Sequence, residues 1–299
     1  MIPVFFTSDN NYAPLIPVAI ASICLNTQEF VSFYVVDGGI TEENKRKIES
    51  LKNDYQNFSI DFVTIDANLF EGFGVPEYLT MAAYYRFMLA NMFPHIGKAL
   101  YLDIDIVVRG DIAHLFNKDL ENYEIAAVED QGSNKLIEKC KQAMGLPKDA
   151  RYFNNGVLLF DLNVWREKDL PSKFFSLEKE YRERLLCADQ DVFNKCFYGK
   201  CKFLHEKYNS PVLREETVIR HYYGALKPWH IHPKLYDNPY EDYHEIKYFW
   251  DVAEKTPFYE ELLAKTDIND IVKLKFDFLL KQKTKERNLQ DVVHNGGAN

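Results

Sequence analysis

The sequence lacks a long hydrophobic run, an excess of basic residues and a regular cysteine pattern. No stretch approaches the roughly 20 apolar residues that a membrane-spanning helix requires, and we expect no secretory signal because the N-terminus lacks a basic start and a long apolar segment. The formal net charge of −9 argues against general nucleic-acid binding, which needs a basic surface. The five cysteines show no spacing typical of a zinc site or a disulfide framework. We therefore expect reduced thiols in a cytoplasmic protein.

What is present is an alternation of short apolar runs and helical segments. The runs 2–6, 33–37 and 60–65 predict strands, and the segments 13–25 and 41–51 predict helices. This alternation predicts an α/β fold with a Rossmann-like, mostly parallel sheet covered on both faces. In such sheets ligands bind beyond the carboxyl ends of the strands. A chain of 299 residues is long enough to bury the core that this fold needs.

The run KALYLDIDIVV, residues 98–108, carries the strongest chemical signal. Its apolar residues predict one buried central strand, which Asp103 and Asp105 interrupt. Residues two apart on a strand point to the same side, about 6.5 Å apart, so both carboxylates would face one point and Ile104 the opposite side. Two like charges placed in this way repel each other unless a cation joins them, which predicts a divalent-metal site. The alternative is a strand that ends in two solvated acids, and this stretch alone favours neither.

Two stretches near this run are candidates for the same site. Arg86 lies in a predicted helix, 78–92, where it is either a solvated residue or an anion-binding one. The segment 152–156, with two asparagines and a glycine before an apolar run, predicts a turn or a close approach of the backbone to a ligand.

Two later stretches carry further candidates. Asp189 and Asp191 flank Gln190 where a helix is predicted to begin, and either acid may simply cap that helix in place of a functional role. His221 stands just before a glycine turn and six residues before Lys227. This combination suits a metal together with a phosphate, and a structural histidine is the alternative.

Taken in order, these stretches resemble the motifs of glycosyltransferase family 8, which holds bacterial lipooligosaccharide galactosyltransferases and glycogenin. The resemblance covers most of the chain and rests on Ser8-Asp9-Asn10-Asn11-Tyr12-Ala13, Tyr85-Arg86, Leu102-Asp103-Ile104-Asp105, Phe153-Asn154-Asn155-Gly156-Val157-Leu158-Leu159, Asp189-Gln190-Asp191 and His221-Tyr222-Tyr223-Gly224 with Lys227-Pro228-Trp229-His230. A lone Asp-x-Asp would be weak, but the ordered set is specific. The sequence departs from the family pattern at Ser8-Asp9-Asn10, where many relatives carry adjacent aspartates, and at Asn155, where a small residue is common.

The resemblance implies a GT-A fold and a role for each matched residue. Asp103, Asp105 and His221 are similar to the family's metal ligands, which implies Mn²⁺, with Mg²⁺ as the alternative ion. Gln190 resembles the amide that faces the anomeric carbon, and Asp189 and Lys227 are the other implied catalytic residues. The implied donor-binding residues are Thr7, Asp9, Asn10, Tyr12, Arg86, Asp103, Ile104, Asn154, Asp189, Gln190, Gly224 and Lys227.

The implied activity is transfer of galactose or glucose from UDP-galactose or UDP-glucose to an acceptor hydroxyl, with retention of configuration. The acceptor would be a glycan, glycolipid or glycoprotein of lipopolysaccharide, capsule or glycoprotein synthesis. A glutamine amide oxygen is a poor nucleophile, so we expect front-face attack through an ion-pair-like transition state, with Asp189 as the alternative nucleophile. Two other functions stay open: a UDP-sugar-binding protein without turnover, and a haloacid-dehalogenase-like phosphatase. The phosphatase is disfavoured because that family places its nucleophile on the first strand.

The C-terminal part of the sequence has a different character. Apolar residues mix with lysines and an arginine in 268–287, which predicts an amphipathic segment. Such a segment can lie on an anionic membrane surface, and a packed surface helix is the alternative. We therefore predict a GT-A catalytic domain, 1–235, and a small helical extension, 236–299, as a candidate for peripheral attachment to the inner face of the cell membrane.

Overall fold

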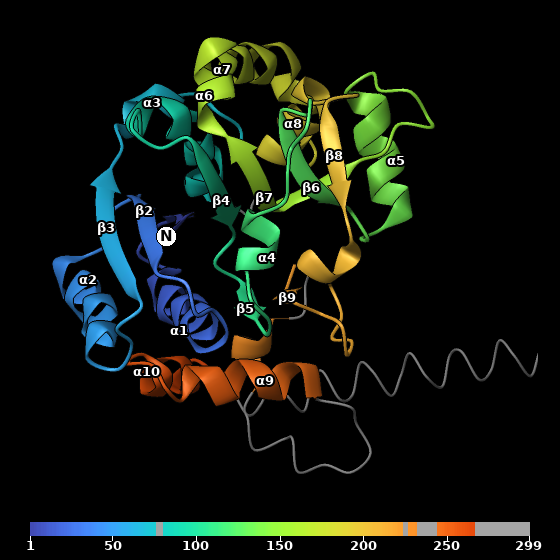
Figure 1. Ribbon diagram of the computed structural model, residues 1–299. Helices are drawn as coiled ribbons and strands as arrows, with labels where there is room; N and C mark the ends of the chain where they lie inside the picture. The colour runs from blue at the N-terminus through green and yellow to red at the C-terminus, as the bar shows by residue number, and fades with distance from the viewer. Residues whose placement is uncertain (76–79, 224–226, 232–243, 267–299) are drawn as a thin grey trace, which may run out of the picture.

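The structure is a computed structural model that describes residues 1–75, 80–223, 227–231 and 244–266. The described part of the chain forms a seven-stranded sheet of order β3-β2-β1-β4-β7-β6-β8 and a two-stranded sheet of β5 and β9 (Figure 1). The strands are β1 (Ile2–Ser8), β2 (Val31–Asp37), β3 (Phe58–Thr64), β4 (Lys98–Leu102), β5 (Ile106–Val108), β6 (Ile125–Glu129), β7 (Phe153–Asp161), β8 (Cys201–Leu204) and β9 (Ile219–His221).

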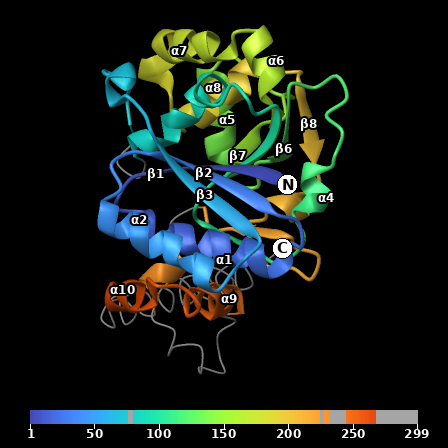
Figure 2. The ribbon, with the colours of Figure 1, turned by 60° about the vertical axis from the view of Figure 1, so that its left-hand side comes forward.

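Helices lie on both faces of the large sheet (Figures 1 and 2). The α-helices are α1 (Ile16–Asn26), α2 (Glu42–Glu49), α3 (Leu89–Met92), α4 (Ala113–Phe116), α5 (Asn134–Ala143), α6 (Leu162–Glu167), α7 (Leu170–Tyr181), α8 (Asp189–Cys196), α9 (His244–Ala253) and α10 (Tyr259–Ala264). The 3-10 helices are η1 (Ala13–Leu15), η2 (Ser50–Asn53), η3 (Ala67–Phe70), η4 (Met81–Met88), η5 (Arg182–Arg184), η6 (Glu206–Tyr208) and η7 (Pro228–His230). None of the helices in the described ranges is both long and apolar enough to cross a membrane.

Strand β1 shows why the sheet is buried on both faces. Val4 and Phe6 belong to the core that the sheet shares with α1 and α9, and Phe5 belongs to the core under η4, α3 and α6 to α8. Successive side chains on a strand point to opposite faces, so a strand covered on both sides needs a continuous apolar run. The views in Figures 1 and 2 agree, with α1, α9 and α10 on one side and α6 and α7 on the other.

The sheet is mixed and mostly parallel, as predicted. β1 is parallel to β2 and β4, and β2 is parallel to β3. β7 runs antiparallel to both of its neighbours, β4 and β6. The start of β7 therefore lies at the carboxyl end of β4, where Leu102 pairs with Val157 and the Asp103 N–H donates to the Gly156 carbonyl at 2.7 Å.

The prediction of one strand over 98–108 was wrong. The chain leaves the large sheet after Leu102 and enters the small sheet at Ile106, so that Asp103, Ile104 and Asp105 form the bend between β4 and β5. Two carboxylates cannot lie inside a buried sheet without a large desolvation penalty, which favours a break at this point. β5 then pairs with β9 so that Ile106 lies opposite His221.

Three other expectations change in detail. The asparagines and glycine of 154–156 lie inside β7 and not in a turn before it. The predicted helix 78–92 is the 3-10 helix η4 followed by the short α3, and residues 76–79 lie outside the described ranges. Part of the predicted extension, α9, packs on the core of α1, whereas 268–287 lies outside the described ranges and the boundary at 235 stays a prediction.

Candidate active site

Three predicted metal ligands meet beside the carboxyl end of β4. Their donor atoms, from Asp103, Asp105 and His221, all lie within 4.8 Å of one another. His221 Nε2 is 3.0 Å from Asp105 Oδ1 and 3.6 Å from Asp103 Oδ2. The convergence that the sequence predicted is therefore present, although a bend and a second sheet produce it and not an extended strand.

In each of the two carboxylates, one oxygen faces His221 and the other accepts hydrogen bonds from neighbouring side chains. Asp103 Oδ1 accepts hydrogen bonds from Arg86 Nη2 at 3.0 Å and from the Tyr101 hydroxyl at 2.8 Å. Asp105 Oδ2 accepts from Lys227 Nζ at 2.7 Å. These contacts fix the orientation of both carboxylates and leave Asp103 Oδ2 and Asp105 Oδ1 facing the imidazole.

Gly156 makes room for this convergence. A Cβ atom built on Gly156 would lie 2.1 Å from His221 Cε1 and 2.7 Å from Asp103 Oδ2. No side chain fits at those distances, so only glycine lets β7 pass so close to both groups. The turn interpretation of 152–156 was wrong, because 153–156 lie in β7. The close approach of this backbone to a bound ligand stays a prediction, whereas its approach to the side chains of His221 and Asp103 is observed.

Asn209 fixes the tautomer of His221. The sequence analysis did not identify Asn209 as a site residue. The Gly156 N–H can only donate, and it does so to Asn154 Oδ1 at 3.0 Å. The same oxygen accepts from Asn209 Nδ2 at 2.8 Å, which turns Asn209 Oδ1 towards His221 Nδ1 at 2.9 Å. His221 Nδ1 must therefore carry the hydrogen, which leaves Nε2 to face the two carboxylates. Asn209 stands in no recognisable motif.

Arg86 is buried, with 4% of its surface exposed, so the solvated interpretation was wrong. Its guanidinium lies between two carboxylates, with Nη2 3.0 Å from Asp103 Oδ1 and Nε 3.0 Å from Asp189 Oδ2. Nη1 donates to the Asn155 carbonyl at 2.8 Å. Burial alone would lower the pKa of Arg86, but the neighbouring carboxylates outweigh it and raise that pKa. Arg86 thus holds the bend after β4 against the start of α8.

Asp189 and Gln190 are the first two residues of α8, and both side chains contact Asn155. Asp189 Oδ2 accepts from Asn155 Nδ2 at 2.6 Å, and burial raises the pKa of Asp189 to about 6. Gln190 Oε1 accepts from the Asn155 backbone N–H at 3.2 Å, which turns its Nε2 to donate to Asp130 Oδ2 at 2.9 Å. Asp130 was missed, although it lies two residues after the predicted strand 125–128. Neither acid of this helix caps it with a side-chain hydrogen bond, since the N-cap is Ala188.

Lys227 is the second cation beside the metal-site acids. Its ammonium donates to Asp105 and to the Tyr222 carbonyl, both at 2.7 Å. Burial raises the pKa of Asp105, but the contacts of its carboxylate with His221 and Lys227 outweigh this effect and hold that pKa well below its usual range. The structure thus brings Lys227 to the metal site, and its predicted contact with a diphosphate stays a prediction.

The remaining predicted donor contacts lie near the end of β1. Thr7 Oγ1 is 3.0 Å from the Tyr101 hydroxyl, which links it to Asp103. Asp9 Oδ1 accepts from the backbone N–H groups of Asn11 and Tyr12, and Asn10 Oδ1 accepts from the Thr41 N–H. Their roles towards uridine stay predictions, as do those of Ile104 in the bend and of Asn154. Gly224 lies outside the described ranges.

The comparisons with known proteins agree with this arrangement. The sequence profile of glycosyl transferase family 8 matches residues 3–232. The chain is 29% identical over 240 residues to the lipopolysaccharide 1,3-galactosyltransferase of Salmonella typhimurium, which covers 74% of this chain and 71% of that protein. It is 27% identical over 289 residues to the lipopolysaccharide 1,2-glucosyltransferase of Escherichia coli K12, which covers 89% and 81%.

A solved structure matches as well. The galactosyltransferase LgtC, in complex with donor and acceptor sugar analogues, is similar with a TM-score of 0.72 and 26% identity over 85% of this chain and 96% of that one. This match shows a GT-A type α/β fold. The family match also removes the phosphatase alternative. The chain belongs to glycosyl transferase family 8 and is a glycosyltransferase.

Proposed function

We propose that this enzyme transfers galactose or glucose from UDP-galactose or UDP-glucose to a hydroxyl of a cell-surface glycan, glycolipid or glycoprotein, with retention of configuration and with Mn²⁺. The relatives that it resembles are named for transfer of both hexoses to lipopolysaccharide, which supports this donor pair and an acceptor of that class. Work on such acceptors fits a cytoplasmic protein at the inner face of the membrane, for which 268–287 is the candidate attachment segment.

The residues present fit a divalent cation. Two carboxylate oxygens and one imidazole nitrogen face one another, and the donor set suits Mn²⁺ or Mg²⁺ better than a thiolate-loving metal. The missing Cβ of Gly156 leaves the space that the side chains of His221 and Asp103 need. Asp103, Asp105 and His221 would hold the ion, with Asn209 as the hydrogen-bond partner of the imidazole. When bound there, the ion would act as a Lewis acid for the leaving diphosphate.

One observation carries the proposal: acids outnumber fixed cations at a site that is built for an anionic donor. Among the described residues of the site, two cations, Arg86 and Lys227, meet four carboxylates, those of Asp103, Asp105, Asp130 and Asp189. A diphosphate would be repelled by this balance unless a divalent cation entered with it. The surplus of acids is thus what a metal-dependent nucleotide-sugar site requires.

The side chains near the sugar position support front-face attack. Gln190 Oε1 already accepts a backbone hydrogen bond, and Asp189 is bound by Arg86 and Asn155, so neither is a free nucleophile. In our proposal Gln190 orients the donor sugar through its amide, and a diphosphate oxygen of the donor takes the proton of the acceptor hydroxyl. Lys227 would stabilise the negative charge that develops on the leaving diphosphate.

The test is a hydrolysis and transfer screen of nucleotide sugars with Mn²⁺, comparing the wild type with Asp103→Asn. We expect Mn²⁺-dependent release of UDP from UDP-galactose, UDP-glucose or both. Loss of one of the two ligating charges should reduce that release by about 10²-fold or more, because a metal contributes several kcal/mol of charge stabilisation. Binding of UDP-sugars without hydrolysis or transfer over a panel of glycan acceptors would favour the alternative of a binding protein without turnover.

A further inference from the structure

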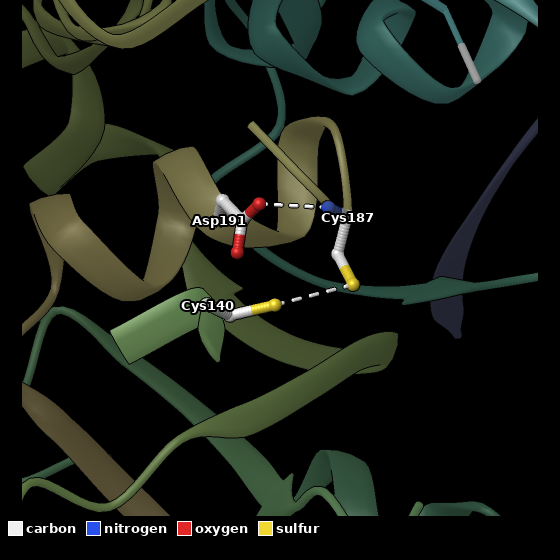
Figure 3. A group of neighbouring side chains, drawn as sticks. All are labelled: Cys140, Cys187 and Asp191. Carbon is white, nitrogen blue, oxygen red and sulfur yellow. Dashed lines mark hydrogen bonds between the residues drawn. The ribbon is translucent and has the colours of Figure 1, made fainter. Parts of the chain in front are cut away.

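A pair of cysteines lies beside the segment that carries Asp189 and Gln190. Cys140, in the middle of α5, and Cys187, just before α8, have their sulfur atoms 3.5 Å apart and pointing at each other (Figure 3). Cys140 is completely buried and Cys187 is half-buried. The other cysteines, Cys24, Cys196 and Cys201, are buried, and burial raises the pKa of each thiol to about 11 or 12. The contact with Cys187, together with burial, raises the pKa of Cys140 as well.

We propose that Cys140 and Cys187 are a reversible dithiol–disulfide pair whose oxidation lowers the activity of the neighbouring site. A disulfide places the sulfur atoms about 2.05 Å apart, so the two must approach each other by about 1.5 Å. Half-buried Cys187 is the thiol that an oxidant reaches first, and Cys140 is the resolving thiol behind it.

The oxidant that we propose is a small disulfide such as oxidised glutathione. The Cys187 thiolate attacks one glutathione sulfur, forms a mixed disulfide and expels one glutathione thiolate. Cys140 then attacks Cys187 Sγ and expels the second, so that two protein thiols lose two electrons and two protons and two molecules of reduced glutathione form. Reduced glutathione or dithiothreitol reverses the same steps.

The backbone joins this pair to the donor site. Asp191 Oδ2 accepts the N–H groups of Leu186 and Cys187, each at 2.7 Å, and the Cys187 carbonyl accepts the Gln190 N–H at 3.0 Å. Ala188, between Cys187 and Asp189, has a φ of +50°, a conformation that a residue with a side chain adopts only when its surroundings impose it. α5 is a regular helix, so the movement falls on this turn. Its effect on activity rests on the proposed function, whereas formation of the disulfide does not.

A metal site is the rival interpretation, because donor atoms of Cys140, Cys187 and Asp191 lie within 4.8 Å of one another. Structural zinc takes four ligands, and this cluster supplies three. Both Asp191 oxygens are already used, Oδ2 by the two backbone N–H groups and Oδ1 by the Tyr152 hydroxyl at 2.7 Å. The carboxylate therefore shapes the turn, and the two sulfur atoms face each other.

The experiment treats the full chain with glutathione buffers of increasing oxidised fraction. The buffers contain no metal that binds thiols. Peptide mapping without reduction should find Cys140 linked to Cys187, and thiol titration should find three thiols in place of five. Donor hydrolysis should fall by the order of 10–100-fold, the cost of a displacement of about 1 Å near the reacting groups. Dithiothreitol should restore it.

Variants separate the pair from general oxidation. Cys187→Ala should keep its activity in dithiothreitol and lose its sensitivity to oxidised glutathione, and Cys140→Ala should stop at the mixed disulfide. If Cys140→Ala does not fold, Cys187→Ala alone carries the comparison. Cys196→Ala, a buried cysteine on α8, is the matched control and should oxidise like the wild type.

Four results would overturn the proposal. Five free thiols after oxidation, or a mixed disulfide on Cys187 that Cys140 never resolves, would show that the pair does not form. A disulfide that leaves donor hydrolysis unchanged would refute the effect of the cysteine pair on the active site. The proposed function would not be affected by that result. Stoichiometric Zn²⁺ that is retained by the wild type through gel filtration and lost in both variants would assign the cluster to a metal. Absence of donor hydrolysis in the reduced protein would instead refute the proposed function.

Discussion

Asn209→Ala should weaken Mn²⁺ binding without touching a metal ligand. The substitution removes the acceptor of the His221 Nδ1–H, which is 2.9 Å from Asn209 Oδ1. Without that partner the imidazole is free to place its hydrogen on Nε2, the atom that faces Asp103 and Asp105. Loss of such a partner typically costs about 10–100-fold in metal affinity, so we expect the Kd for Mn²⁺ to rise by this factor.

The expected loss of stability follows from the groups left without a partner. Asn154 Oδ1 keeps its hydrogen bond from the Gly156 N–H, so only the His221 Nδ1–H is orphaned. One buried donor without a partner costs about 1–3 kcal/mol. The free energy of unfolding in EDTA should fall by that amount. The Kd for Mn²⁺, measured by electron paramagnetic resonance of the free ion, is a separate measurement that depends on the tautomer of His221.

Asn209→Asp is the matched control. Its carboxylate still accepts from the His221 Nδ1–H but cannot donate to Asn154 Oδ1, so it should lose stability and keep its affinity for Mn²⁺. Nitrogen NMR of His221 in the metal-free wild type should show the hydrogen on Nδ1. The reasoning is refuted if Asn209→Ala binds Mn²⁺ as tightly as the wild type while Asp103→Asn does not, or if the wild-type hydrogen lies on Nε2 alone.

Three further outcomes follow from the same geometry. Gly156→Ala should abolish Mn²⁺ binding in the resonance assay and lower the melting temperature, because its Cβ would lie 2.1 Å from His221 Cε1; unchanged binding would contradict the close approach of β7. Gln190→Ala should lower kcat for donor hydrolysis without abolishing it, and a trapped glycosyl-enzyme on Asp189, seen by mass spectrometry, would contradict front-face attack. Burial raises the pKa of Asp189 from 3.8 to about 6, so the protonated form stabilises the fold. At about 1.4 kcal/mol per pH unit, this stabilisation of about 2–3 kcal/mol is full below pH 3.8 and lost as the pH rises through about 6; the difference in unfolding free energy between the wild type and Asp189→Asn, in EDTA on the two sides of pH 6, measures it.

The sequence predicted the metal-site residues for a reason that is partly wrong. The spacing of Asp103 and Asp105 predicts that both lie on one face of a strand, but the two acids follow β4 and lie in the bend between β4 and β5. Their convergence depends on the pairing of β5 with β9, which brings His221 from more than a hundred residues away. A local pattern can identify groups that need a common partner, but only the tertiary pairing decides where they meet.

The residues that were missed differ in what the sequence offered. Asp130 lies two residues after the predicted strand 125–128, and the rule that selected Asp9 at a strand end would also have selected it. Asn209 offered no such signal, because a single asparagine in a loop is most often a turn residue. Its role depends on two side-chain hydrogen bonds, to Asn154 and His221, which lie 55 and 12 residues away in the chain. No periodicity or spacing encodes these contacts. Arg86 was named from the sequence, but its burial between two carboxylates was not predictable from a lone charge on a helix.

The arrangement of partners explains why the site can hold its geometry before a ligand arrives. The candidate ligand atoms are fixed by groups from separate parts of the chain: η4 supplies Arg86, the segment before η7 supplies Lys227, and the loop before β9 supplies Asn209. Each of these contacts takes one atom of a ligand residue and leaves the other turned towards the common point. A cation that binds there need not pay the full entropy of ordering three side chains, since folding has already ordered them. The same charges would be mutually repulsive without their partners, so the stability of this region and its affinity for a cation are set by the same few hydrogen bonds.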